Sequence, residues 1–317
     1  MPETPESPSP DPSRPRRLVW DEVDSNKRKS VLLIVSFVLL VGALGYLLGE
    51  TTRLGPLMPL VALCVALVLS FGSYYYSDRI VLAASRARPV DPEKNPHLVN
   101  VVQGLSIAAG LPPPRVYLID DTAPNAFATG RNPENAAVVV TTGLLEKLNR
   151  QELEGVIAHE MSHIKNYDIR MTTLAAVLVG TVALMSDWAM RSMRWGMWSG
   201  RSRRSSRSGG QLGVVIALLT VVLAILAPIA AQALQFALSR RREYLADANG
   251  ALLTRYPEGL ARALQKIAGD HEPLEVANRA TAPLYIVNPL LDFKGRRAGL
   301  FDTHPPIEER IRRLRGM

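Results

Sequence analysis

Residues 156–164 read VIAHEMSHI, and this stretch decides how the rest of the chain is organised. His159 and His163 stand four positions apart, with Glu160 beside the first. On an α-helix, positions i and i+4 lie on one face, so the two imidazoles can share a metal ion. The spacing is typical of a catalytic zinc site, in which the glutamate takes a proton from metal-bound water. The alternative is an accidental pattern on a surface helix. It is disfavoured because two of only five histidines fall here.

The motif is expected to lie on a polar helix. Asn149 is a suitable N-cap, and Glu152 follows at the spacing of a capping box. Lys165, Asn166 and Tyr167 mark the polar end. Because this helix lacks a long apolar run, the pattern argues against an intramembrane protease, whose motif should lie within an apolar span.

A small β-sheet is expected before this helix. Residues 115–119 and 136–141 are rich in β-branched residues and bounded by turn formers, and residues 125–130 form a short extended piece between them. The segment GRNPE at 130–134 predicts a hairpin turn.

Four apolar runs indicate a membrane protein. Residues 31–49 and 54–72 carry no charge, and as helices each spans about 28 Å, close to the hydrocarbon thickness of a bilayer. Basic residues precede the first run and follow the second, so the predicted transmembrane hairpin has both flanks in the cytoplasm. Residues 171–186 and 212–231 are the third and fourth runs. The expected fold class is therefore a mainly α membrane protein with about four transmembrane helices.

An arginine-rich loop, residues 191–210, separates the last two runs and conflicts with simple topology rules. If all four runs cross, the loop lies outside, against the positive-inside rule; if the last two form a re-entrant hairpin, it remains cytoplasmic. We expect four crossings. Either arrangement returns the chain to the side of the motif.

Composition supports the same organisation. The net charge is +8, but the arginines cluster beside apolar runs without interleaved aromatic residues, so nucleic acid is not an expected partner. The single cysteine excludes an intrachain disulfide and a cysteine-based metal site. We expect a disordered tail at 1–29, a transmembrane hairpin at 30–76, a first catalytic part at 77–170, a second hairpin at 171–238 and a second catalytic part at 239–317.

A third metal ligand must come from elsewhere in the chain, because a catalytic zinc site has three protein ligands and one open position. Residues 240–247 read RRREYLAD, which places Glu243 and Asp247 on one helical face. Glu243 fits the role of ligand, and Asp247 that of the carboxylate that orients a ligating histidine. The alternative is a solvated face on which Glu243 pairs with neighbouring arginines.

Four separated motifs resemble the HtpX-type membrane zinc metalloproteases, which are relatives of the CAAX prenyl endopeptidases. They are HEMSH, the stretch REYLADANGA, Asn125-Ala126-Phe127-Ala128 and Thr303-His304-Pro305-Pro306, and they stand in the family's order. The resemblance runs from about residue 30 to the end. It leaves out the N-terminal tail and the arginine-rich loop.

The resemblance implies a gluzincin-like zinc protease domain containing a small β-sheet. It implies that Glu243 is the third ligand of one Zn²⁺ per chain. It further implies a multi-pass protein of the bacterial inner membrane, with its catalytic domain facing the cytoplasm, that acts in stress response and quality control of membrane proteins. It favours His304 as a residue that contacts the substrate or the transition state.

The remaining site residues are expected to handle the substrate. The oxyanion needs positive support beyond the metal, and His304 and Arg310 are suitable, unless they are a surface cap and part of a solvated basic helix. The strand at 136–141, which contains Val139, would offer its edge to an extended polypeptide, unless it is simply core. Asn125 would add a side-chain hydrogen bond to the substrate backbone.

Two other functions remain open. A processing endopeptidase for lipidated peptides is one, although the chain lacks extra spans to enclose such a substrate. A non-catalytic membrane scaffold with a structural zinc is the other, although such a site has no need of the Glu160 carboxylate beside the metal. Mn²⁺, Co²⁺ and Fe²⁺ also suit these ligand types.

Overall fold

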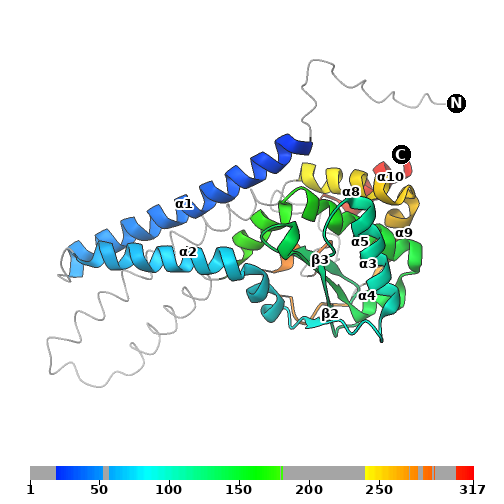
Figure 1. Ribbon diagram of the computed structural model, residues 1–317, viewed down its shortest axis with the longest axis horizontal. Coiled ribbons are helices and arrows are strands. Elements are labelled where there is room, and N and C mark those ends of the chain that lie inside the picture. Colours follow the sequence, from blue (N-terminus) through cyan, green and yellow to red (C-terminus); the bar gives the residue numbers. More distant parts are fainter. Residues whose placement is uncertain are drawn as a thin grey trace, which may run out of the picture.

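Two long helices project from a body that combines a small sheet with shorter helices (Figure 1). The computed structural model describes residues 19–52, 57–178, 180, 240–270, 272–277, 281–287, 289 and 305–317. Most of the predicted second hairpin, including the arginine-rich loop, lies outside these residues, as do residues 1–18 of the predicted tail. Of the third apolar run, residues 171–178 are helical.

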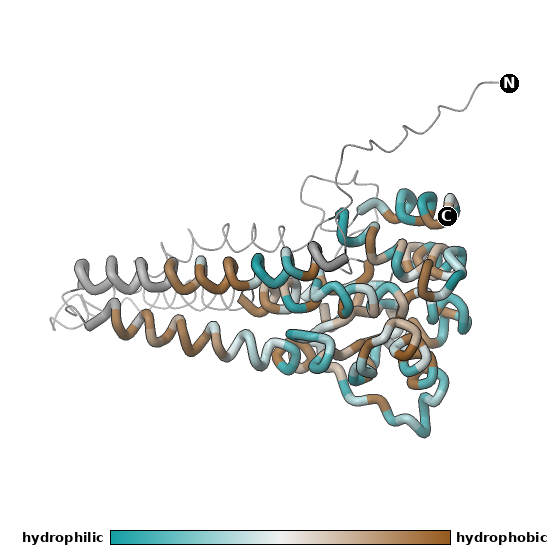
Figure 2. The backbone as a smooth tube through the Cα atoms, turned by 45° about the horizontal axis from the view of Figure 1, so that its top comes forward, coloured by the Kyte–Doolittle hydropathy of each residue, from teal (hydrophilic) through white to brown (hydrophobic). Residues whose placement is uncertain are grey.

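The projecting pair consists of α1 (Val19–Thr52) and α2 (Leu57–Ala84), which lie side by side as an antiparallel hairpin. Figure 2 shows apolar residues along the described part of this hairpin and polar residues where it meets the body. Within the portion that the structure describes, none of the helices combines the length and apolarity that a membrane crossing requires.

The predicted tail ends earlier than expected. Residues 19–29 were assigned to it, but they form the first turns of α1, where Val23 and Asn26 are buried. The physical reason is that Asn26 is hydrogen-bonded to Asn166 and Asp168 of the body, a tertiary contact that polar composition does not reveal.

The sheet has the strand order β1-β2-β4-β3. Its strands are β1 (Arg88–Pro89), β2 (Arg115–Ile119), β3 (Ala126–Thr129) and β4 (Ala137–Thr141). β2 and β4 are parallel, with Tyr117 opposite Val139, whereas β3 and β4 form an antiparallel hairpin. The 3-10 turn η1 (Pro133–Asn135) closes this hairpin. The small sheet and the hairpin turn predicted from the sequence are thereby confirmed.

The prediction that the strand at 136–141 offers its edge to a substrate is wrong. β4 is hydrogen-bonded to β2 on one side and to β3 on the other, and Val139 is fully buried. Its run of β-branched residues reflects a central strand buried on both faces. The edge strand next to β4 is β3.

Helix α5 (Arg150–Lys165) lies at the centre of the body and packs against α3 (Pro96–Ala109), α8 (Arg240–Thr254), α9 (Pro257–Gly269) and β3. Val156, Ile157 and Ala158 are fully buried there. The described residues also include α4 (Thr142–Lys147), η2 (Ala282–Leu284), α10 (Ile307–Arg315) and a helical stretch at 168–178.

Glycines allow α5 to approach its neighbours closely. A Cβ on Gly250 of α8 would lie 3.0 Å from the backbone nitrogen of His159. A Cβ on Gly155 would lie only 2.6 Å from the backbone nitrogen of Leu260 on α9. Since real Cβ contacts are longer, larger residues would push the helices apart and displace the residues that α8 contributes to the site.

Candidate active site

The first turn of α5 is held by a complete capping box, as the sequence predicts. The Asn149 side chain accepts a hydrogen bond from the Glu152 backbone at 3.0 Å, and the Glu152 carboxylate accepts one from the Asn149 backbone at 2.8 Å. The helix continues without a break through the motif, so His159 and His163 lie on one face with their Nε2 atoms 3.2 Å apart.

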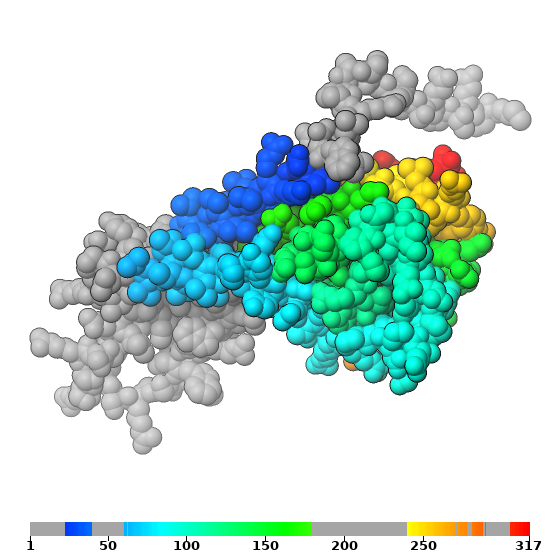
Figure 3. Space-filling model, in the orientation of Figure 1, coloured from blue at the N-terminus to red at the C-terminus, as the bar shows by residue number. Residues whose placement is uncertain are grey.

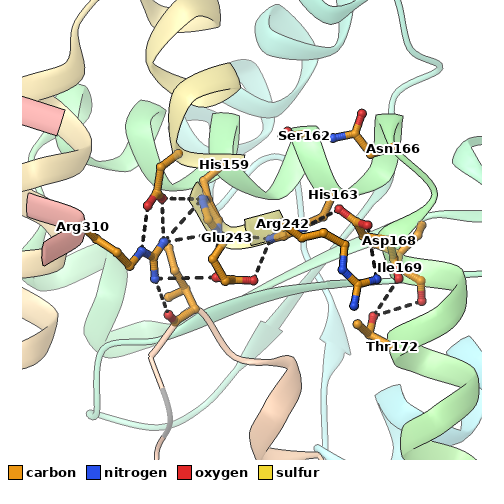
Figure 4. Close-up of polar contacts among 12 residues, drawn as sticks. His159, Ser162, His163, Asn166, Asp168, Ile169, Thr172, Arg242, Glu243 and Arg310 are labelled. Atoms are coloured by element: carbon orange, nitrogen blue, oxygen red, sulfur yellow. Dashed lines mark hydrogen bonds and ion pairs between the residues drawn. The ribbon is translucent and has the colours of Figure 1, made fainter. Parts of the chain in front are cut away.

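Helix α8 brings Glu243 to these two histidines (Figure 4). One carboxylate oxygen of Glu243 lies 3.8 Å from His159 Nε2, and the other lies 3.5 Å from His163 Nε2. A tetrahedral zinc ion bonded at its usual distances of about 2.0–2.1 Å would hold its ligand atoms roughly 3.3 Å apart. The three side chains therefore fit a metal ion of this kind, and they form one cluster of potential ligands.

Carboxylates hold both imidazole rings from behind. Asp247 Oδ1 lies 2.9 Å from His159 Nδ1, and Asp168 Oδ2 lies 3.1 Å from His163 Nδ1. Because an ionised carboxylate only accepts hydrogen bonds, each Nδ1 carries a hydrogen. In a neutral imidazole, Nε2 then has a free lone pair, and both Nε2 atoms face the position between the two histidines and Glu243 where a metal would lie.

Asp168 was not identified from the sequence. It stands five positions after His163, beyond the end of α5, where the helical spacing rule no longer applies. Tyr167 adopts the left-handed backbone conformation with φ of 58°, which non-glycine residues rarely adopt, and this turn brings Asp168 back to His163. An acidic residue just after the polar end of the helix is the only sequence signal for it.

The pKa values of the two histidines move in opposite directions in the metal-free protein. Burial lowers the pKa of His159. For His163, burial also acts to lower the pKa, but the hydrogen bond that its Nδ1–H donates to Asp168 and the charge of Glu243 outweigh it and raise the pKa to about 9. A metal must therefore displace a proton from His163.

Glu160 lines a small cavity. It is 2% exposed, and burial, reinforced by the Glu243 charge, raises its pKa to about 7. The backbone N–H of Ala128 on β3 donates a hydrogen bond to it. The cavity around Glu160 and the two histidines holds about 30 Å³. A carboxylate with this pKa can accept a proton from water and return it near neutral pH.

Arg310 reaches the site from α10 and is fully buried. It donates hydrogen bonds to both oxygens of Asp247 at 2.7 and 2.8 Å and to the Ile286 carbonyl at 3.1 Å, and it lies 3.7 Å from Glu243. The alternative of a solvated arginine is therefore wrong. Its charge and hydrogen bonds hold the pKa of Asp247 at about 2, although burial alone would raise it.

A segment of the chain lies along β3 beside this cavity. The Ile286 N–H donates to the Ala126 carbonyl at 2.9 Å, and the Asn125 side chain donates to the Val287 carbonyl at 2.9 Å. The bond that we predicted from Asn125 to a substrate backbone is thus made to the chain itself. His304 lies outside the described residues.

The whole chain resembles known peptidases. Residues 92–317 match the model of Peptidase family M48. The chain is 50% identical over 298 residues to "Protease HtpX homolog" of Dictyoglomus thermophilum, covering 94% of each chain. It is 45% identical over 300 residues to the homologue of that name in Tropheryma whipplei, covering 95% of this chain and 99% of the relative. The crystal structure of Ste24p from S. mikatae has a TM-score of 0.45 at 20% identity, over 93% of this chain and 66% of that one.

Proposed function

Because this chain belongs to peptidase family M48, we propose that it is a membrane-integral zinc endopeptidase that hydrolyses misfolded or surplus membrane proteins. That it is a metalloprotease follows from the family, and His159, His163 and Glu243 lie close together. The observation that carries the proposal is this cluster beside Glu160, a buried carboxylate with a pKa of about 7. A closed structural metal site has no need of such a group.

We assign the metal ligands as His159, His163 and Glu243. When bound there, zinc supplies the Lewis acidity that lowers the pKa of water towards 7 and polarises the scissile carbonyl. Asp247 and Asp168 keep the two imidazoles in the orientation that directs their Nε2 atoms to the ion. Arg310 holds Asp247 in place and adds positive charge near the site, a different role from direct contact with the substrate.

Glu160 performs the proton transfer. Its carboxylate takes the proton from the attacking water and delivers it to the nitrogen of the departing amine. In the metal-free protein, burial raises the pKa of this carboxylate to about 7, so the pocket itself favours the protonated form that the second transfer starts from. His304 stays a proposed contact of the transition state, from its family motif.

The substrate backbone is proposed to pair with β3, the edge strand next to Glu160. Backbone groups along an antiparallel strand point alternately towards and away from the neighbouring strand. Since the Asn125 carbonyl accepts from Thr141 N–H, the backbone groups of Ala126 and Ala128 point away from β4. Ala128 already donates to Glu160 and Ala126 accepts from Ile286. Since the cavity holds only about 30 Å³, the segment at 281–287 must move before a polypeptide can enter.

Membrane integration is supported by the surface of the α1–α2 hairpin. Large apolar side chains that would normally avoid water lie at least 39% exposed along it, and together they exceed what a soluble surface usually presents. These residues are Val31, Leu32, Val35, Leu39, Leu60, Val61, Leu63, Val65, Leu67, Val68 and Phe71. The basic residues that flank the hairpin favour a catalytic domain on the cytoplasmic side of a bacterial inner membrane.

The test compares Glu160→Gln with Glu154→Gln, a matched change on the exposed face of the same helix. Membranes that contain each full-length variant are washed at alkaline pH, solubilised in detergent and assayed for bound zinc and for hydrolysis of an unfolded membrane protein. We expect both variants to stay in the membrane pellet with one zinc per chain. Only Glu160→Gln should lose hydrolysis, by about 10²–10⁴-fold.

Hydrolysis that survives Glu160→Gln would remove Glu160 from its role. Zinc binding without turnover by the wild type would support a structural zinc instead, and release of the chain by the alkaline wash would contradict membrane integration.

A further inference from the structure

A buried side chain on α1 is hydrogen-bonded into the metal centre from outside the peptidase domain. Asn26 is fully buried, and its side-chain amide donates to Asp168 Oδ1 at 2.7 Å and to the backbone carbonyl of Asn166 at 2.9 Å. Asp168 in turn uses its other oxygen to hold His163. Asn26 stands 140 positions before Asn166, and the match to the family begins only at residue 92.

The same amide also connects to the second ligand-bearing helix. Arg242 donates to the side-chain amide oxygen of Asn26, Oδ1, at 3.4 Å, and its guanidinium lies 3.5 Å from the Asp168 carboxylate. Arg242 immediately precedes Glu243, so Asn26 bridges the end of α5 and the first turn of α8 (Figure 4 shows Arg242, Asp168 and His163). Figure 3 shows α1 seated against the body of the molecule at this end, near α8.

Asp168 has little freedom as long as Asn26 is present. Its carboxylate is buried, and one oxygen receives the strong short bond from Asn26 while the other faces His163. Removal of the Asn26 amide leaves Oδ1 with Arg242 at 3.5 Å. The carboxylate can then rotate towards the guanidinium and away from the imidazole, because buried polar atoms need a hydrogen-bond partner and Arg242 is the donor nearest to Oδ1 among the contacts described.

We propose that Asn26 is a positioning residue of the metal centre, which makes α1 part of the machinery that orients His163. This inference rests on the proposed function, since it assigns His163 to a metal. The bond chain from Asn26 through Asp168 to His163 is the arrangement by which outer hydrogen bonds set ligand orientation and metal affinity. A displacement of α1 relative to the body would therefore change the affinity of the site for its metal.

The experiment measures the zinc dissociation constant of full-length variants by competition with a chelator. Asp168→Ala should weaken zinc binding about 10–100-fold, and Asn26→Ala, which acts one bond further away, roughly three- to tenfold. The matched control is Ser30→Ala: Ser30 is equally buried on α1, one turn later, and among the described residues its hydroxyl donates only to the Asn26 backbone carbonyl. It should bind zinc as the wild type does.

A double-mutant cycle separates positioning from general packing. If Asn26 acts through Asp168, Asn26→Ala should have no further effect on zinc binding in the Asp168→Ala background. An equal loss in both backgrounds, or an Asn26→Ala protein that binds zinc like Ser30→Ala, would overturn the inference.

A second variant at position 26 and the behaviour of the wild type distinguish the remaining outcomes. If Asn26→Ala does not fold, Asn26→Asp retains the shape and the neighbouring Arg242, and its carboxylate cannot donate to Asp168. It should weaken zinc binding at least as much, and unchanged affinity would contradict the inference. A wild type that neither binds zinc nor hydrolyses protein would refute the proposed function itself. A wild type that does both while Asn26→Ala behaves as the control refutes only the role of Asn26.

Discussion

Loss of one partner of the buried pair between Asp247 and Arg310 should destabilise the metal-free protein more than loss of both. Arg310 is fully buried and donates two hydrogen bonds, of 2.7 and 2.8 Å, to Asp247. In Asp247→Asn, the guanidinium retains the Ile286 carbonyl and the more distant Glu243 carboxylate at 3.7 Å, but it loses the negative charge that it contacts most closely. Breaking a buried ion pair in this way costs about 3–5 kcal/mol, whereas exchanging both partners for apolar residues is often close to neutral.

Urea unfolding of metal-free variants, followed by circular dichroism, measures these effects. Asp247→Asn and Arg310→Met should each lower the free energy of unfolding by about 3–5 kcal/mol, and the double variant Asp247→Leu with Arg310→Met by less than either. The control is Arg313→Met on the same helix. Its side chain is 53% exposed and pairs with Glu309, so the loss should be below about 1 kcal/mol. Single variants that lose no more than this control would refute the reasoning, as would a double variant at the sum of the two.

The same site carries three further predictions, on the pH dependence of stability, on the pH dependence of zinc affinity and on substrate pairing. Folding raises the pKa of His163 from 6.5 to about 9, so the stabilisation of the metal-free protein is complete below pH 6.5 and is lost as the pH rises to 9. Glu160, with its pKa raised from 4.5 to about 7, acts in the same direction at lower pH. A urea midpoint that climbs between pH 6.5 and 9 would contradict this, and zinc affinity should rise across the same range because zinc displaces the proton. If β3 pairs with the substrate backbone, N-methylation of a peptide substrate beside the scissile bond should raise KM at least about tenfold, since it removes a main-chain donor. An unchanged KM would argue for side-chain recognition instead.

The features of α5 could be predicted because they are local. The capping box joins residues three positions apart, and the two histidines are brought together by helical periodicity alone. The small sheet was also accessible, since β-branched runs and a turn sequence delimit its strands. Each of these patterns lies within a single helix, strand or hairpin, so it can be recognised without knowing how the chain folds.

The order of the strands was not accessible from these patterns. The residues of β4 are equally compatible with an edge strand or a central strand, and only the pairing with both β2 and β3 decides between them. Arg310 shows the same limit, because it stands in a helix of mostly charged residues and its partner Asp247 lies 63 positions away in the sequence.

By itself, the sequence determined the catalytic helix, its pair of histidines and the glutamate beside them, because helix geometry places residues four positions apart on one face. The helical spacing of residues 240–247 offered Glu243 as a possible third ligand, and the resemblance to a family favoured it. Its closeness to the two histidines depends on the packing of α8 against α5, where Gly250 lies against His159. Tertiary structure alone decided what surrounds the ligands: Asp168 behind His163, Arg310 behind Asp247, and Asn26 reaching the centre from α1. These contacts join segments far apart in the chain, and a buried charge is stabilised by whichever partners the packing of helices brings within hydrogen-bonding distance.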